Sequence, residues 1–86
     1  GANFAEPSIY ECQIKRIMSR ASELAFLYRA KSEFLSPRGC SSGLEQQLLL
    51  YGNLTSALNS SAQLRTISSY AKELGRANEL LSCKLF

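Results

Sequence analysis

Apolar residues recur every three or four positions along most of this chain, a spacing typical of helices that pack around a common core. No segment shows the sustained alternation of apolar and polar residues that a half-buried β-strand would have. The two prolines, Pro7 and Pro37, both lie outside the strongly periodic segments. The pattern therefore predicts an all-α fold, and 86 residues are enough for one domain with a modest core.

The first helix is predicted to cover residues 8–35, behind an N-terminal arm at 1–7. Ser8 and Glu11 form a Ser-x-x-Glu sequence, in which each side chain can bond the other residue's backbone N–H and cap a helix start. The predicted end lies before Pro37, because a residue that precedes proline avoids the helical region of backbone space. The apolar stripe of this helix is Tyr10, Ile14, Ile17, Ala21, Leu24, Tyr28 and Leu35.

Residues 44–58 are the most apolar segment, and their leucines cover more than one helical face. A helix that is wet on one side needs an apolar stripe of only about 100°. We therefore expect a middle helix with neighbours on two sides, covering 43–58. Its start is predicted from a second Ser-x-x-Glu sequence, Ser42 to Glu45, which follows a loop rich in serine and glycine at 36–43. Leu49 lies outside both apolar faces and is expected to be exposed.

A turn is predicted between Ser56 and Leu64, where Asn59 and two serines favour a helix end. Ser60 to Gln63 is a third capping sequence, so the third helix is predicted at 61–85. The alternative is one continuous helix over 44–85, which would have to dimerise to cover its far half. The preferred interpretation is a single antiparallel three-helix bundle over residues 8–86.

The residue types exclude several kinds of site. The three cysteines, Cys12, Cys40 and Cys83, are widely spaced and the chain has no histidine, so no zinc site is expected and the thiols are predicted to be reduced, as in a cytoplasmic protein. The glutamates suit helix caps and solvated faces. We therefore expect no catalytic residues, no metal, no cofactor and no small-molecule substrate. No apolar run approaches the roughly 20 residues of a membrane span.

Two short motifs carry a resemblance to a known family. Residues 46–51 read Gln-Gln-Leu-Leu-Leu-Tyr, and residues 74–80 read Leu-Gly-Arg-Ala-Asn-Glu-Leu. They resemble the second and third helices of the MIT (microtubule-interacting and transport) domain, and are closest to the divergent MIT modules of autophagy-initiating kinases. The matching positions are Leu48, Leu50, Tyr51, Leu74, Arg76, Ala77 and Leu80. Gln47 and Leu54 stand where the family often has alanine, and the link between the second and third helices is shorter than usual.

The resemblance implies a non-catalytic protein-interaction module that serves membrane trafficking or autophagy, either alone or as an accessory domain of a larger enzyme. Such a module would be cytoplasmic and recruited to endosomal or autophagic membranes through its partners. It would bind a partner's helical or extended segment in a groove along the third helix, against either the first or the second helix. The groove residues that it implies are Leu50, Leu54, Ala57, Ala71, Leu74, Arg76, Asn78 and Leu81.

Three other interpretations stay open at this point. The leucines among those groove residues are also what the core of a bundle requires. The wide apolar face of residues 44–58 suits a self-associating helical bundle, in which two chains pair as a homodimer through Leu49, Leu50 and Leu54. The net charge of +3 allows a weakly basic nucleic-acid-binding domain, although the basic residues are spread out and form no run. The nearest basic group is Lys15, Arg16, Arg20 and Arg29.

Overall fold

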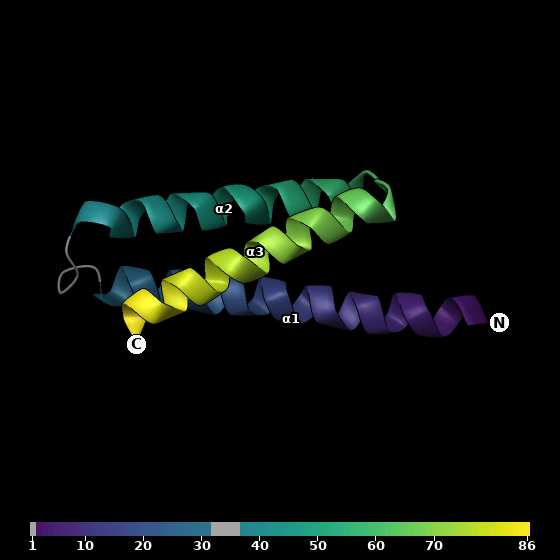
Figure 1. Cartoon of the computed structure of the whole chain (residues 1–86), viewed down its shortest axis with the longest axis horizontal. Coiled ribbons are helices and arrows are strands. Elements are labelled where there is room, and N and C mark those ends of the chain that lie inside the picture. Colours follow the sequence, from purple (N-terminus) through teal and green to yellow (C-terminus); the bar gives the residue numbers. More distant parts are fainter. Residues whose placement is uncertain (1, 32–36) are drawn as a thin grey trace.

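The computed structural model describes the backbone of residues 2–31 and 37–86 and the side chains of 10–31 and 43–86. It contains three helices, α1 (Ala2–Lys31), α2 (Pro37–Asn59) and α3 (Leu64–Leu85), and no strand occurs within the described backbone. The prediction of an all-α three-helix bundle is confirmed. In Figure 1, α2 runs antiparallel to α1, and α3 returns from the end of α2 towards the C-terminal end of α1.

The central helix of the bundle is α3. It packs along both α1 and α2, whereas α1 and α2 share much less contact with each other. The sequence instead predicted residues 44–58 as the middle helix, because of their wide apolar face. The apolar face is wide because it includes leucines that are not in the core: Leu48, Leu49 and Leu58 lie on the surface and are 45%, 59% and 38% exposed. The expected exposure of Leu49 is thereby confirmed.

The core is divided into two clusters along the length of α3. The larger one lies around Leu54 and Leu74, which are both completely buried, and small residues surround them. Ala71 and Ala77 flank Leu74 on α3 and let both neighbouring helices approach closely. Burying a leucine side chain contributes about 1.5–3 kcal/mol to folding. The members of the larger cluster are Ile14, Ala21, Leu50, Leu54, Ala57, Ile67, Ala71, Leu74 and Ala77.

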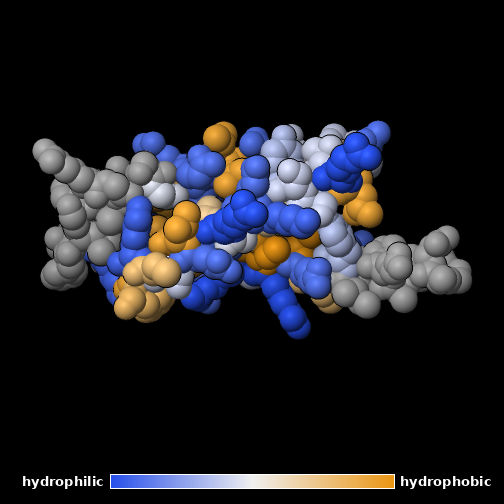
Figure 2. All heavy atoms as spheres, in the orientation of Figure 1, coloured by the Kyte–Doolittle hydropathy of each residue, from blue (hydrophilic) through white to orange (hydrophobic). Residues whose placement is uncertain are grey.

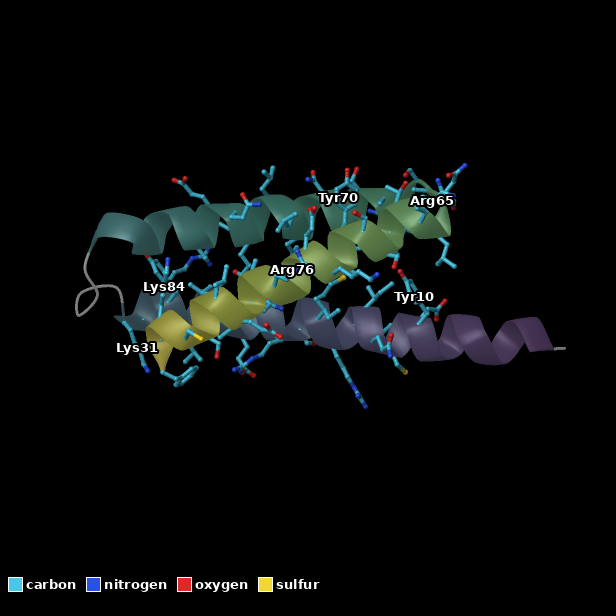
Figure 3. The ribbon with its side chains drawn as sticks, viewed as in Figure 1. Tyr10, Lys31, Arg65, Tyr70, Arg76 and Lys84 are labelled. Atoms are coloured by element: carbon cyan, nitrogen blue, oxygen red, sulfur yellow. The ribbon has the colours of Figure 1, made fainter. Side chains whose placement is uncertain are left out.

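The smaller cluster joins the C-terminal ends of α1 and α3. It contains Leu24 and Tyr28 of α1 and Leu81 and Leu85 of α3. Lys31 lies beside it (Figure 3) and donates a 3.4 Å hydrogen bond to the carbonyl oxygen of Leu85. Its ammonium group also lies 4.8 Å from the centre of the Phe86 ring. A cation at a helix C-terminus is favourable because the unpaired carbonyl groups there carry partial negative charge.

Both predicted starts of the first two helices are wrong. α1 begins at Ala2 and includes the predicted arm, so Ser8 and Glu11 lie inside the helix and do not cap it. Pro7 is the sixth residue of α1, where a proline removes one backbone hydrogen bond and crowds the carbonyl group four residues earlier, yet its fixed φ is helical and the helix continues through it. α2 begins at Pro37, within the predicted loop. Proline suits a first helical position because its missing N–H has no partner there anyway. The predicted end of the first helix at 35 lies outside the described residues.

The predicted break before Leu64 is present, because α2 ends at Asn59 and α3 begins at Leu64. The N–H of Ala62 donates to the carbonyl of Ala57 at 2.9 Å, and the N–H of Ser61 donates to that of Leu58 at 3.3 Å. This pair of bonds is a Schellman motif, whose penultimate residue takes a left-handed conformation. Ser61 has that conformation, with φ of 54°.

The predicted capping sequence at Ser60 to Gln63 does not start α3. Gln63 is the N-cap residue and makes no side-chain capping bond. These serines end α2 instead of starting α3, so the third helix begins at Leu64 and not at 61.

Candidate functional site

Seven of the eight predicted groove residues belong to the core. Leu50, Leu54, Ala57, Ala71, Leu74, Asn78 and Leu81 are all at most 6% exposed. Arg76 is the exception, since it lies exposed near the middle of α3 (Figure 3). The burial of Leu50 and Leu54 also removes them from the surface through which two chains would pair. A partner that binds along α3 therefore has to contact other residues.

A hollow with a volume of about 640 Å³ lies between α1 and α3. Here it is called the α1–α3 groove. Three small residues of α3 create the space: Gly75, Ser82 and Cys83. A Cβ atom added at Gly75 would meet nothing within 4 Å. In Figure 2 an orange, apolar area reaches the surface between α3 and α1 and is bordered by blue, hydrophilic atoms. The groove is lined by Arg16, Ile17, Arg20, Gly75, Asn78, Glu79, Ser82 and Cys83.

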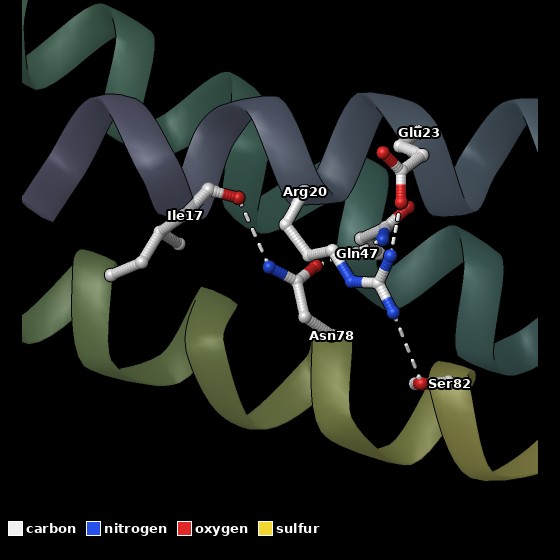
Figure 4. A network of polar contacts seen from close by, with 6 residues as sticks. All are labelled: Ile17, Arg20, Glu23, Gln47, Asn78 and Ser82. Carbon is white, nitrogen blue, oxygen red and sulfur yellow. Dashed lines mark hydrogen bonds and ion pairs between the residues drawn. The ribbon is translucent and has the colours of Figure 1, made fainter.

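A buried chain of amide contacts runs inward from Ile17 and Asn78, which line the α1–α3 groove (Figure 4). Gln47 of α2 donates from Nε2 to Oδ1 of Asn78 at 3.0 Å, and Asn78 donates from Nδ2 to the carbonyl oxygen of Ile17 at 3.0 Å. Gln47 is 1% exposed and Asn78 is 6% exposed. The chain of contacts thus joins all three helices at one level and fixes how α1 sits against α3.

Arginines of α1 form the rim of the groove. Arg20 is ion-paired with Glu23 and also donates to the hydroxyl of Ser82 across the groove at 3.4 Å (Figure 4). Arg16 is exposed and forms no ion pair with any residue whose side chain is described. Glu79 lines the opposite side. Because Glu23 neutralises Arg20, the positive charge left on this rim is that of Arg16, which suits a segment that presents an acidic side chain beside apolar ones.

Of the predicted site residues, the structure places only Asn78 in this groove. Sequence reasoning missed Gly75 and Ser82, and it considered Arg16 and Arg20 only as nucleic-acid contacts. One signal was available: Gly75 and Ser82 are seven residues apart, so they lie on the same side of a helix. Two small residues at that spacing leave room along a helix face.

Other kinds of site find no support in the described part of the chain. Its His, Cys, Asp and Glu side chains form no group of three that could hold a metal ion. Cys12 and Cys83 are exposed and free of disulfide bonds, while the side chain of Cys40 lies outside the described residues. None of the helices, as far as they are described, is long and apolar enough to cross a membrane.

Comparison with known proteins gives no match, whether to family models, to curated protein sequences or to solved structures. The resemblance to the MIT domain therefore rests on the two sequence motifs alone. Of the motif positions, Leu50, Leu74 and Ala77 are buried, and Leu48, Arg76 and Leu80 are exposed.

Proposed function

We propose that this chain is a non-catalytic protein-interaction module that binds a helical or extended segment of a partner in the α1–α3 groove. The observation that carries the proposal is an open hollow of about 640 Å³ along α3, with an apolar residue, Ile17, next to two arginines. Grooves between helices commonly take an amphipathic segment whose apolar side chains enter the groove. Arg16 on the rim favours a segment with a carboxylate at its edge.

The MIT-like motifs support the same proposal and extend it to a biological setting. MIT domains bind short partner segments beside their third helix, and the groove here lies beside α3. On that basis the module would act in membrane trafficking or autophagy, in the cytoplasm, and would reach endosomal or autophagic membranes through its partners.

Chemical-shift mapping tests the proposal. Proteins that bind the immobilised chain are identified from cell extract, and segments of each are titrated into the isotope-labelled chain. We expect saturable changes at the amides of Gly75, Glu79 and Cys83 on α3 and of Arg16 on α1. Changes confined to residues outside the α1–α3 groove would contradict the proposal.

The matched variants of this experiment are two charge reversals. Arg16→Glu places a negative charge on the rim and is expected to weaken binding about tenfold, a change of 1.4 kcal/mol. Lys72→Glu makes the same change of charge at an exposed position of α3 that does not line the groove, and it should leave the affinity within about twofold. Equal effects of the two variants would show that only net charge matters.

A further inference from the structure

The α1–α3 groove carries opposite charges on its two rims. Arg16 of α1 and Glu79 of α3 are both exposed, and both line the groove. Neither forms an ion pair with the other or with any residue whose side chain is described. Arg20 differs, because its charge is already paired with Glu23. The rims therefore leave a cation on the α1 side and a carboxylate on the α3 side for a bound molecule to pair with.

These two charges lie near one level of the bundle. α1 and α3 run in the same direction (Figure 1), and the Asn78 side chain donates to the carbonyl oxygen of Ile17 at 3.0 Å (Figure 4). Arg16 comes one residue before Ile17, and Glu79 comes one residue after Asn78. The two charged residues are therefore separated by about two positions, or about 3 Å, along the helix axes. An occupant of the groove meets both charges within a single helical turn.

The floor between the rims lets an occupant approach closely. A Cβ atom added at Gly75 would meet nothing within 4 Å, so the space above this residue is open. Ser82 and Cys83 continue the floor seven and eight positions later, which gives it a length of about 12 Å. Ile17 is partly buried and supplies an apolar contact in the same hollow. The floor thus suits apolar side chains, and the charges stand at its edges.

A helical occupant suits this groove better than an extended one. Both walls are helices, whose backbone N–H and C=O groups bond within each helix, so they present no sheet edge to which an extended segment could add. An extended segment would bury its own backbone groups without protein partners, whereas a helix satisfies them internally.

We infer that the α1–α3 groove takes an amphipathic helix of a partner protein that has a carboxylate on one edge of its apolar stripe and a basic side chain on the other, within one turn of each other. The inference rests on the proposed function, since it names the class of segment that binds in the same groove. The carboxylate pairs with Arg16 and the basic side chain pairs with Glu79. A helix with acidic residues alone would bring like charges together at Glu79, which disfavours it.

The same charges determine the direction in which the helix lies. Turning the helix end to end in the groove exchanges its two edges. Its carboxylate would then face Glu79 and its basic side chain would face Arg16. Because like charges across an interface suppress the wrong arrangement, a given partner binds in one direction only.

The test selects helices on the 86-residue chain. A displayed library of helix-forming peptides, with an apolar stripe and random residues along both edges, is selected on the unchanged chain and counter-selected on Gly75→Trp, which fills the groove. Circular dichroism checks the helix content of this variant, and if that content is lost, Cys83→Trp at an exposed lining position replaces it. Selected peptides are expected to carry an acidic residue on one edge and lysine or arginine on the other.

Charge exchanges then identify the pairs. Glu79→Lys should weaken a selected peptide about tenfold, and exchanging the peptide's basic residue for glutamate should restore the affinity to within about twofold. Arg16→Glu and a lysine in place of the peptide's acidic residue form the second exchange. The matched control is Glu73→Lys, at an exposed position of α3 that does not line the groove, and it should leave the affinity within about twofold.

The inference and the proposed function can fail separately. Gly75-dependent peptides without a basic edge, equal effects of Glu79→Lys and Glu73→Lys, or no restoration by the exchanged peptides would overturn the inference alone. So would a library that yields no Gly75-dependent helix, while a captured partner segment does depend on Gly75. If neither a helix nor a captured segment depends on Gly75, the proposed function fails as well.

Discussion

Asn78 of α3 lies where the three helices meet, and its side chain bonds to both of the other helices. It accepts from Gln47 of α2 and donates to the backbone of Ile17 in α1. Its position in the core explains why a polar residue stands among the leucines and alanines of α3. A buried amide pair of this kind disfavours other registers of the helices, because any slip leaves two amides unpaired.

Replacing one member of the Gln47–Asn78 pair should lower the free energy of unfolding more than replacing both. Asn78→Leu keeps the branched shape of the side chain but leaves the Gln47 amide buried without any bond, which should lower the free energy of unfolding by about 2 kcal/mol. Adding Gln47→Leu removes the unpaired group. The double variant is therefore expected to be at least about 1 kcal/mol more stable than the sum of the single effects indicates. Urea unfolding of the four proteins measures this, and additivity within about 0.5 kcal/mol would contradict the role of the pair.

At the scale of residues, the sequence distinguished buried positions from exposed ones, but it did not distinguish core leucines from groove leucines. The apolar spacing identified the stripe through Ile14, Ala21 and Leu24, which is buried. It also put Leu54 and Leu74 in a groove, although both are completely buried. A leucine at a regular helical position has the same spacing in either setting. What decides between them is how close the neighbouring helix comes, and that depends on small residues elsewhere.

At the scale of elements, helix ends were harder to predict than helices. Pro37 was interpreted as the end of one helix, yet it also begins the next one. The capping sequences at Ser8 and Ser42 lie inside helices. A Ser-x-x-Glu sequence caps only where the backbone before it has left the helix, and four residues do not encode that.

The turn between α2 and α3 gives a sharp test of backbone strain. Ser61 occupies the left-handed position of the Schellman motif, which glycine adopts without strain. Ser61→Gly should therefore raise the free energy of unfolding by about 0.5–1 kcal/mol. The matched control is Ser60→Gly, one residue earlier, where φ is not positive and the Ser60 hydroxyl donates to the carbonyl of Ala57.

The control should lower stability, because glycine loses more freedom on folding and the hydroxyl contact disappears. Thermal unfolding followed by circular dichroism compares both variants with the unchanged chain. A decrease in melting temperature for Ser61→Gly would show that this position is not strained.

The glycine within α2 offers a second test at the same scale. No neighbour packs against the helix backbone at Gly52, because a Cβ atom added there would meet nothing within 4 Å. Gly52→Ala should then stabilise the protein by about 1 kcal/mol, which is the difference in helix propensity. Chemical denaturation measures the gain. A loss of stability would indicate a close contact on this face of α2, such as a second chain.

At the scale of the whole molecule, α3 lies between the other two helices, and this position determines which segments resist local unfolding most. Its inward face contacts both neighbours, while the N-terminal end of α1 extends past the turn between α2 and α3 (Figure 1). The sequence predicted three helices and the break before Leu64, but it placed the most apolar helix in the middle of the bundle. Apolar content does not determine which helix lies in the middle, because leucines such as Leu49 can remain exposed.

Hydrogen exchange should follow this arrangement. Amides near Leu74 and Leu81 are expected to exchange most slowly, through global unfolding, and those in the first turns of α1 most rapidly. Exchange measured by nuclear magnetic resonance at individual amides would show it. Slower exchange throughout α2 than in the middle of α3 would contradict the central place of α3.

The central claim is that partners bind in the α1–α3 groove and not at the buried leucines. Its most direct test is the affinity of a captured partner segment, measured by calorimetric titration, for two variants of Gly75. Alanine adds little volume where nothing lies within 4 Å, so Gly75→Ala should bind within about twofold of the unchanged chain. Gly75→Trp fills the groove and should weaken binding by about tenfold or more. Equal affinities for the alanine and tryptophan variants, with both folded, would contradict the claim.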